Sequence, residues 1–319
     1  MKKIMLIDPY FGTLPREWFQ VILDSCRNNK TINWLLITDD HTQYNYPSNV
    51  KVVYEDWTNF AKSIKKLIYD KYGFNCSLDY PFKLCDYRPL YGTIFSEYLE
   101  GYDYWGYSDM TDVVYGDLRK FLTSEILTFD KVNYLGHLTL FKNDQKVNDR
   151  YLIKLNNGIS FKDILRQKDN MAFDEITGQN NIQQIYEENS FSFVLINDMV
   201  ADVSPLRFAF QLSKFDKNKK QYYEPYRKQV FSLENGHLFC WYLKDGEIHK
   251  KEYGYIHLQK RKMNNYTHTI NKMLIVPNKF IDYREITRNI ISQNSRKKLY
   301  TPFFKLKLKA LKTRLKNRK

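Results

Sequence analysis

The sequence KIMLID, residues 3–8, is the stretch from which the fold can be read outward. It is a short apolar run that ends at Asp8-Pro9, and because proline lacks a backbone N–H, the pattern predicts a buried strand followed by a loop. The runs INWLLIT at 32–38 and VKVVY at 50–54 predict two more strands. Apolar residues at helical spacing lie between the first two runs, so the chain begins strand, helix, strand, strand.

The following residues continue this alternation up to residue 142. The expected elements are a helix capped by Thr58 and ended by Gly73, a helix over 82–99 interrupted at Pro89, a strand over 103–109, an amphipathic helix from Leu118 to Leu127, and a strand over 132–142. Strands that alternate with helices predict an α/β fold with a mainly parallel sheet flanked by helices on both faces.

The second half has a less regular pattern and predicts a mixed α+β region. Its expected strands cover 191–196, 231–243, 252–258 and 272–277. The pair Asn235-Gly236 indicates a hairpin turn, because both residues tolerate a positive φ.

Composition excludes several classes of protein. The chain has 319 residues, of which 43% are hydrophobic and 16% aromatic, whereas Gly and Pro together number only 21, which excludes collagen-like and wholly disordered chains. No apolar run approaches the roughly 20 residues that span a bilayer, and the N-terminus lacks a signal-peptide core. Cys26, Cys76, Cys85 and Cys240 show no metal-binding spacing, so we expect reduced thiols in the cytoplasm.

The basic charge belongs to the C-terminal tail. Residues 296–319 hold eleven Lys or Arg and no acid, and removing them from the net charge of +14 leaves +3 for residues 1–295. Phe304, Leu308, Leu311 and Leu315 form one apolar stripe among these cations, which predicts a basic amphipathic C-terminal helix. Such a helix binds an anionic membrane surface, although a disordered basic tail and an RNA-binding arm remain open.

The segment WGYSDMTDVVYGD, residues 105–117, carries the most informative chemistry. An apolar strand delivers Asp109 and Asp112 to its carboxyl end, where open α/β sheets bind ligands. Carboxylates suit Mg²⁺ or Mn²⁺ bound to a diphosphate, whereas the alternative is a solvated acidic turn. Residues at i and i+3 share a face of a strand only where a turn or bulge intervenes.

Several segments together resemble a family of bacterial glycosyltransferases of surface-polysaccharide biosynthesis. They are KIMLIDPYFG at 3–12, the region 83–122, GHLTLFKN at 136–143, AFDE at 172–175 and YIHLQKRKM at 255–263. The resemblance covers residues 1 to about 280 and centres on a variant of the DxD motif. It implies a GT-A-like, Rossmann-like fold and transfer of a sugar from a nucleotide-sugar donor to a capsular or lipopolysaccharide-type glycan.

The resemblance also implies roles for the acidic motif. Asp112 takes the place of the second Asp of the motif and is the preferred direct ligand of Mn²⁺ or Mg²⁺. Asp109 is expected to contact the ribose or a metal-bound water, and His257 to join the metal shell or the diphosphate. For His257, the alternative is a half-buried histidine on a strand.

Donor contacts are implied for three further groups of residues. Tyr10 and Asp39 would hold the nucleotide base, and Lys260 and Lys262 would contact phosphates. The third group, on the interrupted helix, would border the donor sugar or diphosphate: Lys83, Asp86 and Arg88. The alternatives are a packing aromatic and a loop acid for Tyr10 and Asp39, and a solvated basic loop for Lys260 and Lys262. For the third group the alternative is a structural ion pair between Asp86 and Arg88, although residues at i and i+2 do not face each other on a helix.

Asp174 and Glu175 are the implied catalytic residues. In an inverting enzyme one of them would accept the proton of the acceptor hydroxyl as general base, whereas a retaining enzyme requires no such base. Helix capping is the alternative for both residues. The sequence leaves the stereochemistry open.

The resemblance implies a nucleotide-sugar-binding half at 1–142, an acceptor-side half at 143–295 and the tail at 296–319. The basic amphipathic tail suits an enzyme at the inner face of the plasma membrane, with a glycan or lipid-linked glycan as acceptor. The charge of only +3 on residues 1–295 argues against a nucleic acid as partner. The alternatives are a nucleic-acid-binding protein, a metal-dependent phosphoesterase and a non-catalytic relative.

Overall fold

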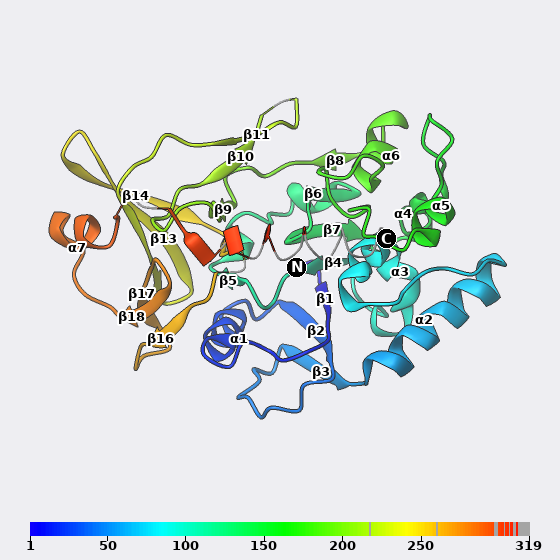
Figure 1. Ribbon diagram of the computed structural model, residues 1–319, viewed down its shortest axis with the longest axis horizontal. Helices are drawn as coiled ribbons and strands as arrows, with labels where there is room; N and C mark the ends of the chain where they lie inside the picture. Colours follow the sequence, from blue (N-terminus) through cyan, green and yellow to red (C-terminus); the bar gives the residue numbers. More distant parts are fainter. Residues whose placement is uncertain are drawn as a thin grey trace. The chain divides into compact units, whose positions relative to one another are not determined.

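A computed structural model describes residues 1–216, 218–259, 261–296, 299–302, 304–305, 307–308 and 311 (Figure 1). The chain forms two units: one contains Met1–Val113 and Leu118–Ile196, and the other contains Val114–Asp117 and the chain from Asn197 onward. We call them unit 1 and unit 2. The functional division expected at residue 142 stays a prediction.

Unit 1 contains a seven-stranded sheet in the order β3-β2-β1-β4-β7-β6-β8. The strands are β1 (Ile4–Tyr10), β2 (Ile32–Thr38), β3 (Val50–Tyr54), β4 (Tyr104–Ser108), β6 (Lys131–Leu135), β7 (Leu138–Lys142) and β8 (Phe193–Val194). The first four are mutually parallel, which confirms the α/β class. The sheet is mixed, because β7 pairs antiparallel with both β4 and β6.

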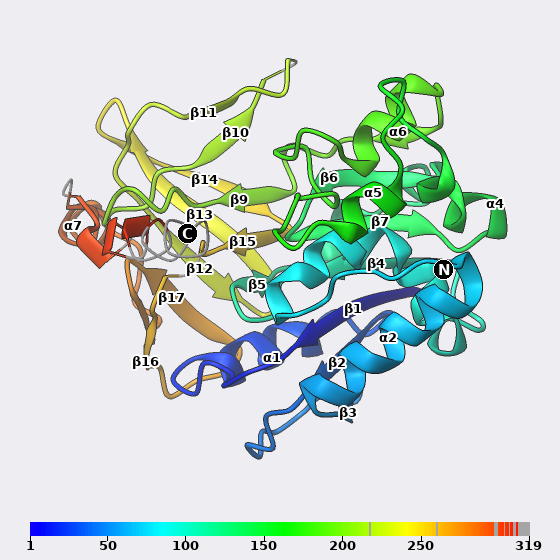
Figure 2. The same ribbon diagram turned by 45° about the vertical axis from the view of Figure 1, so that its right-hand side comes forward.

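The helical elements of unit 1 are mostly short. They are α1 (Phe19–Arg27), α2 (Trp57–Tyr72), η1 (Pro81–Leu90), α3 (Tyr91–Ile94), η2 (Ser96–Tyr98), η3 (Leu118–Lys120), η4 (Ile126–Thr128), α4 (Gln145–Asn148), η5 (Arg150–Leu152), α5 (Phe161–Arg166) and α6 (Ile182–Glu188). In Figures 1 and 2, α1 and α2 lie on opposite sides of β1, β2 and β3. Alternation along β1 explains this arrangement: Met5 and Ile7 pack in the same core as Phe60 and Ile64 of α2.

Unit 2 is mainly antiparallel. Its six-stranded sheet has the order β14-β13-β12-β17-β18-β16, in which only β16 and β18 pair in parallel. Smaller sheets join β10 to β11 and place β15 between β5 and β9. The bounds are β5 (Val113–Tyr115), β9 (Val200–Asp202), β10 (Ser213–Phe215), β11 (Gln221–Tyr223), β12 (Gln229–Glu234), β13 (His237–Lys244), β14 (Glu247–Tyr253), β15 (Tyr255–His257), β16 (Asn264–Tyr266), β17 (Lys272–Val276), β18 (Lys279–Asp282) and α7 (Arg288–Gln293).

Two predictions from local turn residues are confirmed, the end of a helix at Gly73 and a hairpin turn at Asn235-Gly236. Gly73 ends α2 with φ 69°, and Asn235 and Gly236 form the β12–β13 turn with φ 51° and 86°. The cap of α2 is Asp56 rather than Thr58, because the Asp56 carboxylate accepts a hydrogen bond from the Asn59 amide at 3.0 Å.

Two expected elements of the first half are wrong. The helix over 118–127 is replaced by η3 and η4, because the Thr123 hydroxyl accepts from the Ile126 amide and starts a new turn. The single strand over 132–142 is a hairpin, β6 and β7, that turns at Gly136-His137. This hairpin supplies the antiparallel strands, so the expected mainly parallel sheet is corrected to a mixed one.

In the described part of the chain, no helix is long and apolar enough to cross a membrane. The four cysteines are free. Much of the expected C-terminal helix, including Leu315, lies outside the described residues. Within them, Phe304, Leu308 and Leu311 are exposed.

Candidate functional site

The candidate site lies at the carboxyl ends of β1 and β4 in unit 1. From β1 the chain forms β2 and β3 on one side, and then places β4 on the other side of β1. All four strands are parallel, so their carboxyl ends share one edge of the sheet. The change of direction between β1 and β4 is the topological switch point, where open α/β sheets bind ligands.

A buried carboxyl group joins the two strand ends. Asp8 of β1 accepts hydrogen bonds from the Ser108 hydroxyl at 2.7 Å and the Met110 amide at 3.4 Å. Burial raises the pKa of the Asp8 carboxyl to about 8, against the lowering effect of the Ser108 hydrogen bond. Asp8 therefore holds the start of the loop that carries Asp109 and Asp112, which we call the acidic loop, against β1.

A tight turn brings Asp109 and Asp112 into one loop. The amides of Asp112 and Val113 both donate to the Asp109 carbonyl oxygen, at 3.0 and 3.1 Å. The Trp18 indole N–H donates to the Thr111 carbonyl oxygen at 3.0 Å and ties the turn to the segment before α1. This is the intervening turn that the i, i+3 spacing of the two acids requires.

Arg88 of η1 is the cation at this edge. Its Nη2 donates to Asp109 Oδ1 at 2.5 Å, and its Nη1 donates to Asp174 Oδ2 at 2.8 Å and to the Gly136 carbonyl oxygen at 3.0 Å. Burial lowers the pKa of Arg88, but the two carboxylates outweigh burial and hold that pKa above its ordinary value. One guanidinium thus connects η1, the acidic loop, the β6–β7 turn and the segment after α5.

Gly136 makes room for this cluster. A Cβ atom at residue 136 would lie 2.9 Å from Arg88 Nη1, 3.0 Å from Asp174 Oδ2 and 3.1 Å from Glu175 Oε2. The hairpin turn therefore approaches the ionic groups more closely than an ordinary side chain allows.

The two predicted catalytic acids have different surroundings. Asp174 is buried, and burial raises its pKa to about 7, against the lowering effect of Arg88. The Glu175 carboxylate accepts from the Thr177 hydroxyl at 2.7 Å and the Gly136 amide at 3.3 Å, and its residue is partly exposed. Asp174 thus binds Arg88 directly, whereas Glu175 lies beside the cluster and contacts the Gly136 amide.

Lys83 and Asp86 form a closed ion pair. Both side chains are fully buried and lie 2.6 Å apart, and Asp86 also accepts from the amides of Met171 and Phe173. Lys83 in turn donates to two backbone carbonyl oxygens, those of Ile164 and Asp169. These contacts support a positioning role for the pair; donor contact stays a prediction.

The predicted base-binding residues help to hold the loop after β1. Asp39 accepts from the Gly12 amide at 2.7 Å, and Asp40 accepts from the Leu14 amide at 2.7 Å. The Tyr10 hydroxyl donates to the Thr13 carbonyl oxygen at 3.2 Å. Tyr10 and Asp39 therefore border the same loop, near the carboxyl ends of β1 and β2.

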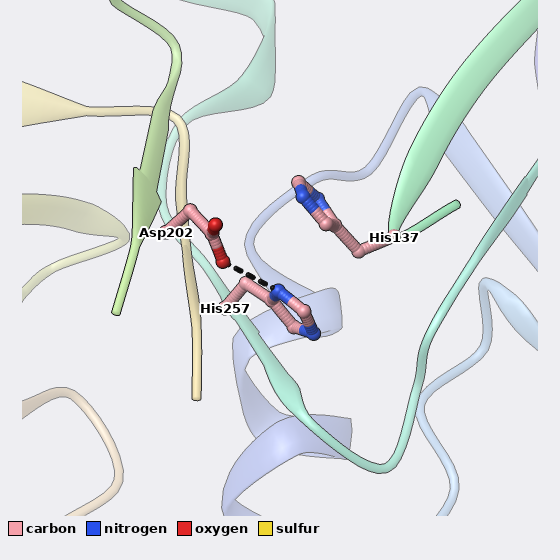
Figure 3. Close-up of side chains that lie close together, drawn as sticks. All are labelled: His137, Asp202 and His257. Atoms are coloured by element: carbon pink, nitrogen blue, oxygen red, sulfur yellow. Dashed lines mark hydrogen bonds and ion pairs between the residues drawn. The ribbon is translucent and has the colours of Figure 1, made fainter. Parts of the chain in front are cut away.

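His257 lies in unit 2, on β15, and its Nδ1 is 2.8 Å from Asp202 Oδ1 (Figure 3). Among the basic residues that follow, Lys262 is exposed, and Lys260 lies outside the described residues. Arg261 is buried and donates to the backbone carbonyl oxygens of Ser204 and Phe208, so its charge holds a loop of unit 2.

Sequence reasoning missed the Gly136 carbonyl group, Ser108 and Asp202 as members of these networks. The Gly136-His137 pair was a turn signal inside the apolar run 132–142 and could have revealed the hairpin. Asp202 gave no comparable signal, because its pairing with His257 arises from two strands that are far apart in the sequence.

The chain belongs to the family of unknown function DUF6625, whose match covers residues 6–284. This range includes Asp8, Arg88, Asp109, Asp174 and His257. No curated protein and no solved structure matches the chain.

Proposed function

Starting from this family of unknown function, we propose that the protein is a glycosyltransferase that transfers a sugar from a nucleotide-sugar donor to a surface glycan. The observation that carries the proposal is the Arg88 cation held between Asp109 and Asp174 at the switch point. A cation and carboxylates at that edge suit a diphosphate and a divalent ion, which are the groups that a nucleotide sugar brings.

The strand order supports a GT-A-like fold as the finer class. The order β3-β2-β1-β4 places the loops after β1, β2 and β4 at one edge, where a nucleotide would lie across the strand ends. Tyr10 and Asp39 in the first two loops are the proposed contacts of the base. The DxD-like turn at 109–112 follows β4.

Asp112 and Asp109 fit a divalent ion by the chemistry of their donor atoms. Mg²⁺ and Mn²⁺ prefer hard oxygen ligands, and Mg²⁺ is commonly held by one or two carboxylates together with substrate phosphates. When bound, the ion would neutralise the negative charge that develops on the leaving nucleoside diphosphate. Participation of His257 in the metal shell stays a prediction.

The residues of the chain supply the remaining requirements of the transfer. The acceptor hydroxyl oxygen forms a bond to the anomeric carbon, and the bond from that carbon to the diphosphate breaks, with its electron pair leaving on the diphosphate. Arg88 is the fixed cation that stabilises the leaving group. In an inverting reaction Glu175 accepts the hydroxyl proton, and Asp174 holds Arg88; a retaining reaction needs no such base.

The proposed acceptor is a glycan or lipid-linked glycan at the inner face of the plasma membrane. The exposed side chains of Phe304, Leu308 and Leu311 support this location, because a stripe of apolar residues among lysines suits an anionic lipid surface.

The experiment is a thermal-shift screen of nucleoside diphosphate sugars with and without Mn²⁺. A donor that binds only the folded state raises the melting temperature. We expect a shift that requires Mn²⁺ in the wild type and is lost in Asp112→Asn. Asp245→Asn is the matched control, because Asp245 is exposed in a turn at φ 51°, which asparagine also tolerates.

No shift with any donor would contradict the proposal, as would an equal shift in Asp112→Asn. A donor that shifts the melting temperature is then incubated with glycan acceptors. Breakdown of the donor at the same rate without acceptor would favour a phosphoesterase instead. If the full-length protein bound RNA and lost that affinity on removal of residues 296–319, the result would favour a nucleic-acid-binding protein. A transferase should keep its turnover on a soluble acceptor after the same removal.

A further inference from the structure

The segment 10–18, which leads from β1 to the start of α1, is held in place by two carboxylates that follow β2. Asp39 accepts a hydrogen bond from the Gly12 amide at 2.7 Å. Asp40 accepts one from the Leu14 amide, also at 2.7 Å. Hydrogen bonds to an ionised carboxylate are stronger than those between neutral groups. The position of the segment is therefore set by β2 and the residues that follow it.

Trp18, at the end of this segment, has a fixed backbone. Its amide donates to the Pro15 carbonyl oxygen at 3.1 Å, and its own carbonyl oxygen accepts from the amides of Val21 and Ile22 at 3.0 and 3.3 Å. The next residue, Phe19, begins α1 and is fully buried. The indole ring of Trp18 therefore extends from a backbone that cannot shift without displacing α1.

The indole N–H of Trp18 bonds the peptide unit that lies between the two acids of the acidic loop. It donates to the Thr111 carbonyl oxygen at 3.0 Å. The N–H of the same peptide unit belongs to Asp112 and donates to the Asp109 carbonyl oxygen at 3.0 Å. A peptide unit is planar and trans, so its C=O and N–H groups point in opposite directions. This unit is held at both ends and cannot rotate without breaking one of the two bonds.

Asp8 holds a different part of the acidic loop. Its carboxyl group accepts from the Ser108 hydroxyl at 2.7 Å and from the Met110 amide at 3.4 Å, and both donors precede the 111–112 peptide unit. Asp8 thus secures the start of the loop, whereas Trp18 acts on the turn between the two acids.

Tyr10, at the beginning of the segment 10–18, lies close enough to Asp112 for an electrostatic interaction. Burial raises the pKa of the Tyr10 hydroxyl above its ordinary value, and the negative charge of Asp112 raises this pKa further. The proposed base contact and the acidic loop are thus neighbours, and the segment 10–18 connects them through Trp18.

We infer that Trp18 is a positioning residue, which holds the turn of the acidic loop in the conformation that binds the nucleotide and couples this turn to the segment 10–18. The inference deepens the proposed function and rests on it, because Tyr10 and Asp39 are the proposed contacts of the base and Asp112 is the proposed contact of the divalent ion. It assigns a role to Trp18, a residue that the proposed transfer does not use.

The test is NMR of the backbone amides in the full-length protein, with Trp18→Phe as the variant, because phenylalanine keeps an aromatic ring but has no N–H to donate. We expect one sharp Asp112 amide signal in the wild type. In Trp18→Phe this signal should broaden or split, because the 111–112 peptide unit then exchanges between orientations. Trp57→Phe is the matched control and should leave the signal unchanged: the partly exposed indole of Trp57 packs against Phe11 and donates no hydrogen bond within the described part of the chain.

The coupling to nucleotide binding is tested with ADP, CDP, GDP and UDP as separate probes, each with Mg²⁺. A nucleotide that binds the wild type should bind Trp18→Phe about 2- to 10-fold more weakly, because it must then order the turn without the help of one neutral hydrogen bond. Trp57→Phe should bind it with the affinity of the wild type. Isothermal titration calorimetry measures these affinities.

An unchanged Asp112 signal in folded Trp18→Phe would overturn the inference, and so would equal nucleotide affinities of Trp18→Phe and the wild type. If Trp18→Phe does not fold, the wild type decides: its Trp18 indole proton should exchange slowly with water, and exchange as fast as in free tryptophan would overturn the inference. Failure of all four nucleotides to bind the wild type would count against the proposed function, while the Asp112 signal still decides whether Trp18 holds the turn.

Discussion

Two ionic clusters on the same ten-residue segment, η1, have opposite characters. Lys83 and Asp86 pair with each other, with both side chains at 0% exposure. Arg88 pairs with Asp109 and Asp174, and the Arg88 and Asp109 side chains are 15% and 32% exposed. The first cluster is sealed inside the protein, whereas the second reaches the edge where the parallel strands end.

The difference in exposure distinguishes an ion pair that stabilises the fold from one that can bind a ligand. A buried pair whose partners are complete has no atom to offer a ligand, and it stabilises the fold only as long as both charges remain. A partly exposed cation between two carboxylates can exchange one partner for a phosphate. The largest effects of substitution are therefore expected in the sealed Lys83–Asp86 pair, and smaller ones around the partly exposed Arg88 cluster.

Removal of Asp86 should have the largest effect on stability. Asp86→Ala leaves the Lys83 ammonium group buried without its counter-charge and should lower the free energy of unfolding by about 3–5 kcal/mol. Urea denaturation followed by circular dichroism measures this loss. Lys83→Met combined with Asp86→Leu should recover part of it, and a loss below about 1 kcal/mol in Asp86→Ala would contradict the sealed pair.

Arg88→Lys should affect function more than stability. Lysine keeps the charge but cannot bond Asp109 and Asp174 through two fixed N–H groups, so we expect a fall in transfer rate of about 100-fold. Steady-state kinetics on the donor found in the thermal-shift screen measures the rate. The exposed substitution Arg166→Lys is the control; equal activity of Arg88→Lys and the control would remove Arg88 from the mechanism.

A side chain at residue 136 tests how tightly the open cluster is built. Gly136→Ala places a methyl group within 2.9 Å of Arg88 Nη1 and should cost about 1–3 kcal/mol of stability. Thermal denaturation measures the cost. The contrasting change is Ala172→Gly, which removes a methyl group from a residue with φ 54°. Because glycine adopts a positive φ without strain, this substitution should introduce no new steric strain. An unchanged stability of Gly136→Ala would show that the β6–β7 turn moves to accommodate the methyl group, and it would contradict a tightly packed cluster.

Asp8 should make stability depend on pH. Its pKa is about 8 in the folded chain against 3.8 ordinarily, because burial disfavours the charged form. Between these values the folded state holds a proton that the unfolded state has lost, so the free energy of unfolding falls as pH rises, by at most about 1.4 kcal/mol per pH unit. The contribution is complete below about pH 4 and lost through about pH 8.

Urea denaturation between pH 5 and pH 8 provides the measurement. Asp8→Asn cannot titrate and should show a shallower dependence than the wild type, whereas the exposed change Asp70→Asn should keep the wild-type slope. Equal slopes in Asp8→Asn and the wild type would show that Asp8 is ionised in the folded protein.

Local patterns account for the elements that the sequence predicted well. Strands β2 and β3 match the expected runs 32–38 and 50–54 residue for residue, because short β-branched runs bounded by polar residues specify a strand locally. The helix expected over 118–127 failed because apolar periodicity does not register competition from a threonine hydroxyl at residue 123.

The sequence by itself determined the α/β class, the C-terminal end of helix α2 at Gly73, the β12–β13 turn at Asn235-Gly236, and the acids that follow β4. These features depend on backbone sterics and on periodicity within a few residues. Only the tertiary structure decided that Arg88 meets Asp174, 86 residues away, and that Asp202 meets His257, 55 residues away. Such pairings depend on strand order and burial, which no local pattern encodes.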